Sequence, residues 1–232
     1  MTKEIETRYG KVHFSTAMTG KLEGINALST SVVLNMFCQA RQAIKGSICE
    51  KCYAQSTLEF KKSLGFNCEE NYEILANHLL DEHDFPFTTD IFFRIEAFGD
   101  VATVTQCRNY IRFARRNPQT TFSFWTKNPA VWDRALKLEG KPENMIAGLS
   151  SLFVNQPENA DRWTWIDFVF TVYTADFSIA HDIEINCGGR KCIECRRCYT
   201  MRRTENGPVI VNEMLKSQVK RYYKLLAEKA AK

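Results

Sequence analysis

The sequence lacks a long apolar run. No stretch approaches the roughly 18 to 20 consecutive apolar residues that a membrane-spanning helix needs. The opening residues, Met1 to Gly10, are polar and do not form the charged and then apolar leader of a secreted protein. We therefore expect a cytoplasmic protein with no membrane partner.

Several motifs of common enzyme classes are also missing. The chain has no P-loop, no G-x-G-x-x-G and no G-x-S-x-G, so neither a phosphate-binding glycine loop nor a serine nucleophile is indicated. Histidine is scarce, and the four histidines show no metal-binding spacing with one another or with the cysteines. We interpret these residues as surface or helix-cap residues: His13, His78, His83 and His181.

Cysteine, by contrast, is abundant, with nine in 232 residues. A disulfide framework is not expected in a reducing compartment, and a chain of this length with 44% apolar residues can bury a core without one. Metal binding is therefore the favoured role for the clustered cysteines.

The positive charge is concentrated near the C-terminus. The net charge is only +4, yet residues 186–232 hold twelve Lys and Arg against four Glu, which leaves the rest mildly acidic. This basic segment could attract nucleic acid, chiefly through Arg196, Arg197, Arg202 and Arg203.

Alternating apolar segments predict an α/β fold. Strands are expected at residues 12–14, 31–37, 90–95, 120–125, 145–149 and 166–173, and helices at 55–64, 69–80, 101–115, 130–138 and 209–232. Strands that alternate with helices at this spacing indicate parallel βαβ units, in a partial (β/α) barrel or an open sheet. We expect one globular unit, with an α/β part (residues 1–185) and a cysteine-rich segment with a terminal helix packed on it (residues 186–232).

Polar and cysteine residues follow several of the expected strands. Because the carboxyl ends of parallel strands meet at one edge of a sheet, function should gather there. The residues at these positions are Cys38, Glu96 to Asp100, Lys127, Ser150 and Ser151.

Four cysteines near the C-terminus fall within twelve residues: Cys187, Cys192, Cys195 and Cys198. Four thiolates complete a tetrahedral zinc site, and they equally complete a 4Fe-4S cluster with one cysteine for each iron. Structural zinc usually uses two C-x2-C pairs separated by a longer loop, so this compact run favours iron–sulfur, with zinc as the alternative metal.

A second group upstream has three members, Cys38, Cys49 and Cys52. Three cysteine ligands leave one iron of a 4Fe-4S cluster open to a substrate or cofactor. Cys38 could instead be a buried cysteine at a strand end, and some of the three could join the C-terminal four around shared metals. Cys68 and Cys107 are interpreted as packing residues.

Short motifs around these cysteines carry a resemblance to known families. Residues 49–54, CEKCYA, are similar to the cluster loop of radical S-adenosylmethionine proteins and of related phage proteins. The segments 93–100, 124–129 and 148–150 follow in the order in which those phage proteins carry GD, TK-x-P and G-x-S elements. The chain also resembles a cysteine-rich phage family named after gene product eighty-eight, over roughly residues 32–151 and the cysteine-rich end.

The resemblance implies a partial barrel with a 4Fe-4S cluster at its mouth. S-adenosylmethionine would bind the open iron, and its reductive cleavage would give a 5'-deoxyadenosyl radical, which requires an electron donor. The implied cluster ligands are Cys38, Cys49 and Cys52, the implied cofactor or substrate contacts are Glu96, Gly99, Asp100, Lys127 and Ser150, and the C-terminal four would hold an auxiliary cluster. The usual motif is C-x3-C-x2-C, whereas ten residues separate Cys38 from Cys49 here.

Three functions are therefore open. The first is a radical S-adenosylmethionine-like enzyme acting on an unidentified substrate, in a host cytoplasm if the protein is phage-encoded. The second is a zinc-stabilised nucleic-acid-binding protein, and the third is a non-catalytic iron–sulfur protein of phage origin.

Overall fold

The computed structural model describes residues 3–230, which form a mixed α/β fold around one parallel sheet. The sheet strands are β3 (Asn26–Leu28), β4 (Phe92–Ile95), β5 (Thr121–Thr126), β6 (Met145–Ser150), β7 (Phe168–Tyr173) and β8 (Val209–Met214). A separate antiparallel hairpin consists of β1 (Glu4–Thr7) and β2 (Gly10–His13). The helices are α1 (Met36–Gln42), α2 (Tyr53–Phe60), α3 (Lys62–Asn77), α4 (Val104–Arg116), α5 (Pro129–Glu139), α6 (Ala175–Ala180), α7 (Cys192–Cys195), α8 (Arg197–Thr200) and α9 (Val219–Ala230).

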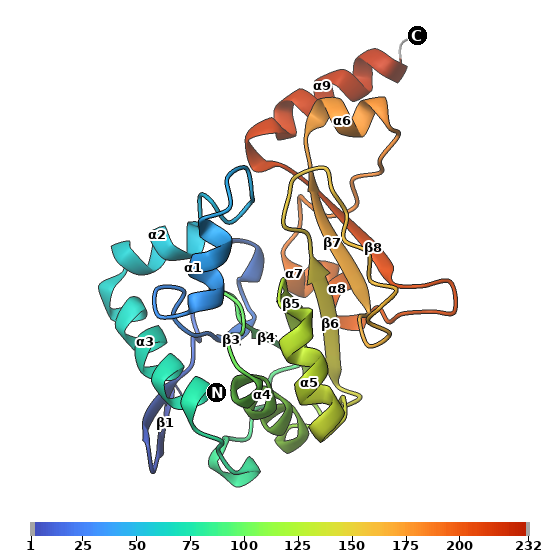
Figure 1. The fold of residues 1–232 in the computed structure, drawn as a ribbon. Coiled ribbons are helices and arrows are strands. Elements are labelled where there is room, and N and C mark those ends of the chain that lie inside the picture. The colour runs from blue at the N-terminus through green and yellow to red at the C-terminus, as the bar shows by residue number, and fades with distance from the viewer. Residues whose placement is uncertain (1–2, 231–232) are drawn as a thin grey trace.

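The six strands lie side by side in chain order, β3-β4-β5-β6-β7-β8, and every neighbouring pair is parallel. The connections from β3 to β4, from β4 to β5 and from β5 to β6 contain α1 to α3, α4 and α5, whereas α6, α7 and α8 lie in the connection from β7 to β8. Within residues 3–230, β3 and β8 do not pair with each other, so the sheet is open. Figure 1 shows α1, α2 and α3 to the left of the strands and α6 and α9 above the upper end of β7.

One face of the sheet, here called the first face, carries the main apolar core. Side chains alternate along a strand, so Phe93 and Phe124 point to this face. Trp132 of α5 stacks on Phe124 with ring centroids 3.8 Å apart, and Phe113 of α4 meets Phe122 at 5.0 Å. Such aromatic pairs add about 1 kcal/mol each beyond the burial of their area.

The opposite face, the second face, is covered by the cysteine-rich segment. Phe92 of β4 packs against Tyr199 of α8 with ring centroids 5.1 Å apart. Ser123 of β5 donates a hydrogen bond to the carbonyl of Cys198 at 2.7 Å. The predicted terminal segment therefore lies directly on the sheet.

Most of the expected elements are confirmed within a few residues. The strands predicted at 90–95, 120–125, 145–149 and 166–173 correspond to β4, β5, β6 and β7, and the helices at 101–115 and 130–138 correspond to α4 and α5. The helices predicted at 55–64 and 69–80 correspond to α2 and α3, although α3 begins earlier, at Lys62. The predicted parallel βαβ arrangement is thus an open sheet.

The strand predicted at 31–37 is wrong. The hydroxyl of Ser31 accepts hydrogen bonds from the backbone N–H groups of Val33 and Leu34, which turns the chain. Asn35 then caps α1, so Cys38 lies in a helix and not at a strand end. Short polar side chains that bind nearby backbone compete with strand pairing in this way.

The single helix predicted at 209–232 is also wrong in its first part. Residues 209–214 form β8, which pairs with all of β7 from Phe168↔Val209 to Tyr173↔Met214, and the helix α9 begins only at Val219. The short strand β3 lies in a stretch that was expected to be mostly loop. Among residues 3–230 no helix is long and apolar enough to cross a membrane.

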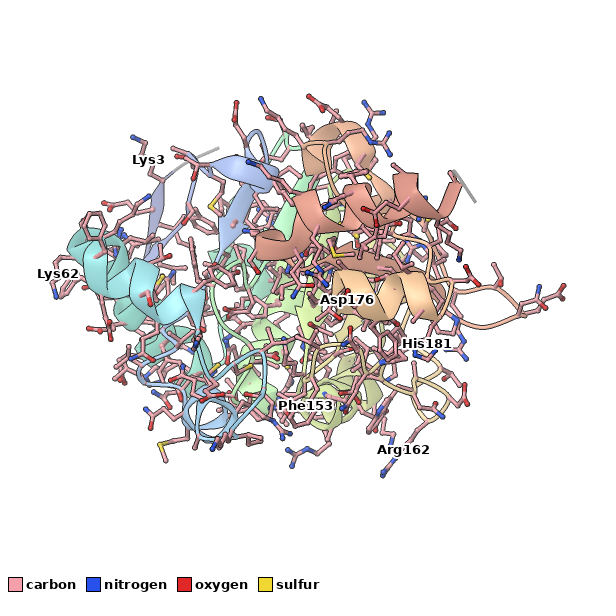
Figure 2. The ribbon with its side chains drawn as sticks, turned by 90° about the horizontal axis from the view of Figure 1, so that it is seen from above. Lys3, Lys62, Phe153, Arg162, Asp176 and His181 are labelled. Atoms are coloured by element: carbon pink, nitrogen blue, oxygen red, sulfur yellow. The ribbon has the colours of Figure 1, made fainter. Side chains whose placement is uncertain are left out.

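The molecule viewed from above, in Figure 2, shows α6 alongside α9. Asp176 and His181 mark α6 in this view, and Lys62 marks the start of α3 at the opposite side. Arg221 of α9 forms an ion pair with Asp176 at 2.6 Å, which joins α9 to α6, the helix that follows β7.

Candidate cysteine centres

The first cysteine group lies at the carboxyl end of the sheet. The side-chain oxygen of Asn35 accepts hydrogen bonds from the N–H groups of Phe37 and Cys38, at 3.0 and 3.2 Å. Its amide nitrogen donates to the carbonyl of Asp100, at 2.6 Å. One buried asparagine therefore caps α1 and ties Cys38 to the loop that follows β4.

The loop that carries Cys49 and Cys52 is held against the end of β6. The N–H of Ile48 donates to the carbonyl of Leu152 at 2.8 Å, and Ser47 forms an isolated bridge with Phe153. Cys52 is the residue before α2, and the hydroxyl of Tyr53 donates to the carbonyl of Ala97 at 2.9 Å. Both ends of this loop thus contact the residues that follow sheet strands.

The thiols of this group lie within electrostatic reach of one another. Burial raises the pKa of Cys38 strongly, and the charges of Asp100 and of the Cys52 thiolate raise it further. Burial also raises the pKa of Cys49, while the charge of Lys127 lowers it. Raised pKa values keep the thiols of Cys38 and Cys49 protonated near neutral pH, so a bound cation would be needed to hold these two as thiolates.

The buried carboxylate of Glu96 forms its hydrogen bonds with other residues of the protein. Its carboxylate accepts hydrogen bonds from the Thr30 hydroxyl and the Gln106 amide, each at 2.8 Å, and from the Tyr110 hydroxyl. Its backbone adopts φ of 51°, a left-handed conformation that costs about 1–2 kcal/mol for a residue with a side chain. Burial raises the pKa of Glu96 to about 7.

Asp100 anchors the same loop to the next strand. Its carboxylate accepts hydrogen bonds from the Thr126 hydroxyl at 2.7 Å and from the backbone N–H of Lys127 at 2.5 Å. Gly99 has φ of 98°, and a Cβ there would lie 2.8 Å from Val32. Glu96 and Asp100 therefore direct their carboxylates inward to hold the loop, and a contact of these residues or Gly99 with S-adenosylmethionine stays a prediction.

Lys127 and Ser150 meet, as their positions at neighbouring strand ends predict. The ammonium of Lys127 donates to the Ser150 hydroxyl at 3.0 Å. Ser151, by contrast, is buried and shares a hydrogen bond with Thr171 at 2.8 Å. The predicted gathering of polar residues at the carboxyl ends of β4, β5 and β6 is thus present, with Lys127 as its partly exposed cation.

The second cysteine group lies on the second face and beside β8. The N–H of Cys187 donates to the carbonyl of Asn212 at 2.9 Å. Cys192 and Cys195 begin and end α7, and Arg196, with a left-handed φ of 59°, turns the chain into α8 before Cys198. Two short helices joined by a tight turn thus carry Cys192, Cys195 and Cys198.

The four thiols of this group affect one another electrostatically. Burial raises the pKa of Cys198 to about 12, and the charges of Cys187, Cys192 and Cys195 each contribute. The Lys21 ammonium lies 3.7 Å from the Cys187 sulfur and also pairs with Glu213. The positive charge of Lys21 lowers the pKa of Cys187 against the effect of burial.

Arg94 is a further polar residue at this centre, and it was not singled out from the sequence. It is 5% exposed, and its guanidinium lies over the Trp125 ring, 3.6 Å from the centroid. Burial raises the pKa values of Cys192 and Cys198, and the positive charge of Arg94 opposes this rise. An arginine inside the apolar strand sequence FFRI was the available signal, because arginine is almost never buried without a partner.

No three side chains of His, Cys, Asp or Glu within residues 3–230 form a group that could hold a metal ion as they stand. Cys68 and Cys107 are buried in α3 and α4, which agrees with packing roles. A surface depression of about 460 Å³ contains no cysteine in its lining, which consists of Asp81, Glu82, His83, Asp84, Arg112, Arg115 and Glu139. Glu139 there already pairs with Arg108 and Arg115, so we assign that depression no chemistry.

Comparisons with known proteins identify no relative of the chain. No family model matches, and no curated protein and no solved structure matches significantly.

Proposed function

We propose that the protein is an iron–sulfur protein with two cysteine centres, and that the first centre makes it a radical S-adenosylmethionine-like enzyme. The observation that carries this proposal is the position of Cys38, Cys49 and Cys52. Their three backbone segments are each bonded to residues that follow β4 or β6, at the edge where parallel sheets hold their ligands.

The donor sets fit such centres. Thiolates are the ligands of iron–sulfur clusters, and both groups consist of partly buried thiols whose charges would repel one another without a cation. Beside the second group, two guanidinium nitrogens of the buried Arg94 have no hydrogen-bond partner, which fits an anionic metal–thiolate centre.

The residues around the first group would position and polarise a bound cofactor. Asn35 fixes the start of α1, Asp100 fixes the backbone of Lys127, and the charge of the Lys127 ammonium opposes the rise that burial causes in the pKa of Cys49. A carboxylate of S-adenosylmethionine would find its natural counter-charge in Lys127. When bound, a three-cysteine 4Fe-4S cluster would supply an electron and an open iron position.

The enzyme proposal is tested by product formation. After anaerobic reconstitution with iron and sulfide, the protein is incubated with S-adenosylmethionine and dithionite, and 5'-deoxyadenosine is measured. We expect formation in the native chain, loss in Cys49→Ser and Cys52→Ser, and retention in Cys68→Ala, whose thiol is buried in α3. Iron retained without any 5'-deoxyadenosine would leave a non-catalytic iron–sulfur protein.

Cys38 needs its own variant because its spacing departs from the usual motif. We expect Cys38→Ser to lower the iron content of the first centre to that of Cys49→Ser. An unchanged iron content would remove Cys38 from the ligand set.

The zinc-stabilised, nucleic-acid-binding alternative has less support. Arg202 donates to the carbonyls of Met145 and Glu143, so its guanidinium already has protein partners. If nucleic acid binds, neutralising Arg196, Arg197 and Arg203 should weaken binding and reduce its salt dependence. Stoichiometric zinc in place of iron would favour this alternative.

A further inference from the structure

Arg94 carries a buried positive charge on β4, the strand next to the edge strand β3. It lies on β4 with 5% of its surface exposed, and both Nε and Nη1 lack a hydrogen-bond partner. Among residues 3–230 it forms no ion pair with a carboxylate. Stacking on the Trp125 ring offsets part of the cost of burying this cation, and a neighbouring anion would offset more of it.

Arg94 lies beside residues that contact the second cysteine group. Its register partner on β5 is Ser123, whose hydroxyl holds the Cys198 carbonyl at 2.7 Å. Cys192 and Cys198 pack against a small apolar cluster that contains Tyr199. The acidic residue beside this group, Glu213, already pairs with Lys21.

A metal bound by four thiolates supplies the missing negative charge. Four thiolates carry a charge of −4, and either one Zn²⁺ or a 4Fe-4S core of charge +2 leaves a net charge of −2. We propose that Arg94 is the buried counter-cation of a metal–thiolate centre formed by Cys187, Cys192, Cys195 and Cys198. This inference rests on the proposed metal-binding function, and it assigns Arg94 a positioning and charge-balancing role.

If Arg94 has this role, removing its charge should destabilise the metal-bound protein and should not destabilise the metal-free protein. With metal bound, removing the charge takes away attraction to the anionic centre, so metal is lost more readily and an iron–sulfur cluster becomes harder to reduce. Without metal, removing the charge relieves an unpaired buried cation, so the protein is at least as stable as before. Replacing a residue that serves only for packing would instead destabilise both the metal-bound and the metal-free protein.

The test compares Arg94→Met with Arg94→Lys and with a matched control. Arg116→Met is the control, because Arg116 also stacks on an aromatic ring, Phe87 at 3.7 Å, and also has an unpartnered Nε, but it lies at the end of α4. Each full-length protein is loaded with metal, and loss to a chelator, thermal stability with and without metal and, for iron, the reduction potential are measured.

We expect Arg94→Met to lose metal at least tenfold faster than the native chain, with a more negative reduction potential if the metal is iron. Arg94→Lys should stay close to native on both measures, Arg116→Met should not differ from native, and metal-free Arg94→Met should melt no lower than the metal-free native protein. Native metal retention in Arg94→Met, together with metal loss in Cys192→Ser and Cys198→Ser, would overturn the role of Arg94 and leave the centre intact. Unchanged metal content in those two cysteine variants would overturn the centre itself and the Arg94 proposal with it.

Discussion

Glu96 combines a left-handed backbone with a fully buried carboxyl group, and its ionisation should be visible in the stability of the protein. Its pKa is raised to about 7 by burial, from an ordinary value of 4.5. Between these two values the unfolded chain releases the proton while the folded chain keeps it. The free energy of unfolding should therefore fall as pH rises through this window, by on the order of 3 kcal/mol.

The variant Glu96→Gln removes this ionisation. We expect the decline in unfolding free energy between about pH 4.5 and pH 7 to flatten in this variant, as measured by urea unfolding at several pH values. Glu59→Gln, at an exposed position on α2, should keep the native pH profile. A native decline in Glu96→Gln would mean that another group titrates in this range.

At the scale of single elements, the short helix α1 depends on one residue. Asn35 caps two N–H groups of the helix and donates to Asp100 from a buried position. We expect Asn35→Ala to lower the free energy of unfolding by about 2 kcal/mol, from the lost cap and the lost buried hydrogen bond. Chemical denaturation measures the change, and Asn77→Ala, at an exposed position with only local bonds, should stay within about 0.5 kcal/mol of native.

Gly148 of β6 is closely packed against two aromatic rings. A Cβ at Gly148 would lie 2.2 Å from the ring of Phe168 and 2.6 Å from Trp125. We expect Gly148→Ala to destabilise the protein by about 2 kcal/mol, because the close-packed rings must move. Phe168→Leu should partly rescue this variant, and a double-mutant cycle measures the coupling. Additive effects would show that the clash is relieved elsewhere.

The elements that the sequence predicted well are those whose pattern is local. The apolar periodicity of α4 and α5 and the apolar runs of β4 to β7 result from burial on one or both faces, which any single segment reveals. The failures depend on partners distant in the chain or on side-chain bonds. β8 is a strand because it pairs with β7, and residues 31–35 form a turn because Ser31 and Asn35 bind the backbone.

The candidate site shows the same division. The topology of a parallel sheet predicts that Lys127 and Ser150 meet, and they do. Arg94 and Asn35 were not predicted, because their roles arise from the electrostatic effect of Arg94 on Cys198 and from the hydrogen bond of Asn35 to Asp100, residues far away in the sequence. The inward hydrogen bonds of Glu96 likewise depend on Tyr110 and Gln106 of α4.

At the scale of the whole molecule, residues 186–230 complete the sheet in two ways. They add β8 to the edge of the sheet, and they cover the second face with α7 and α8. The two cysteine groups are therefore carried by one continuous framework, with Arg94 on the sheet itself.

The function of this protein depends on what the cysteines bind. Iron, acid-labile sulfide and zinc should be measured per chain after anaerobic purification and reconstitution, together with the visible absorption spectrum. Two 4Fe-4S clusters predict a brown protein with about eight iron and about eight sulfide per chain, falling to about four of each when Cys192 and Cys198 are replaced by serine. A colourless protein with stoichiometric zinc and no sulfide would contradict the iron–sulfur assignment.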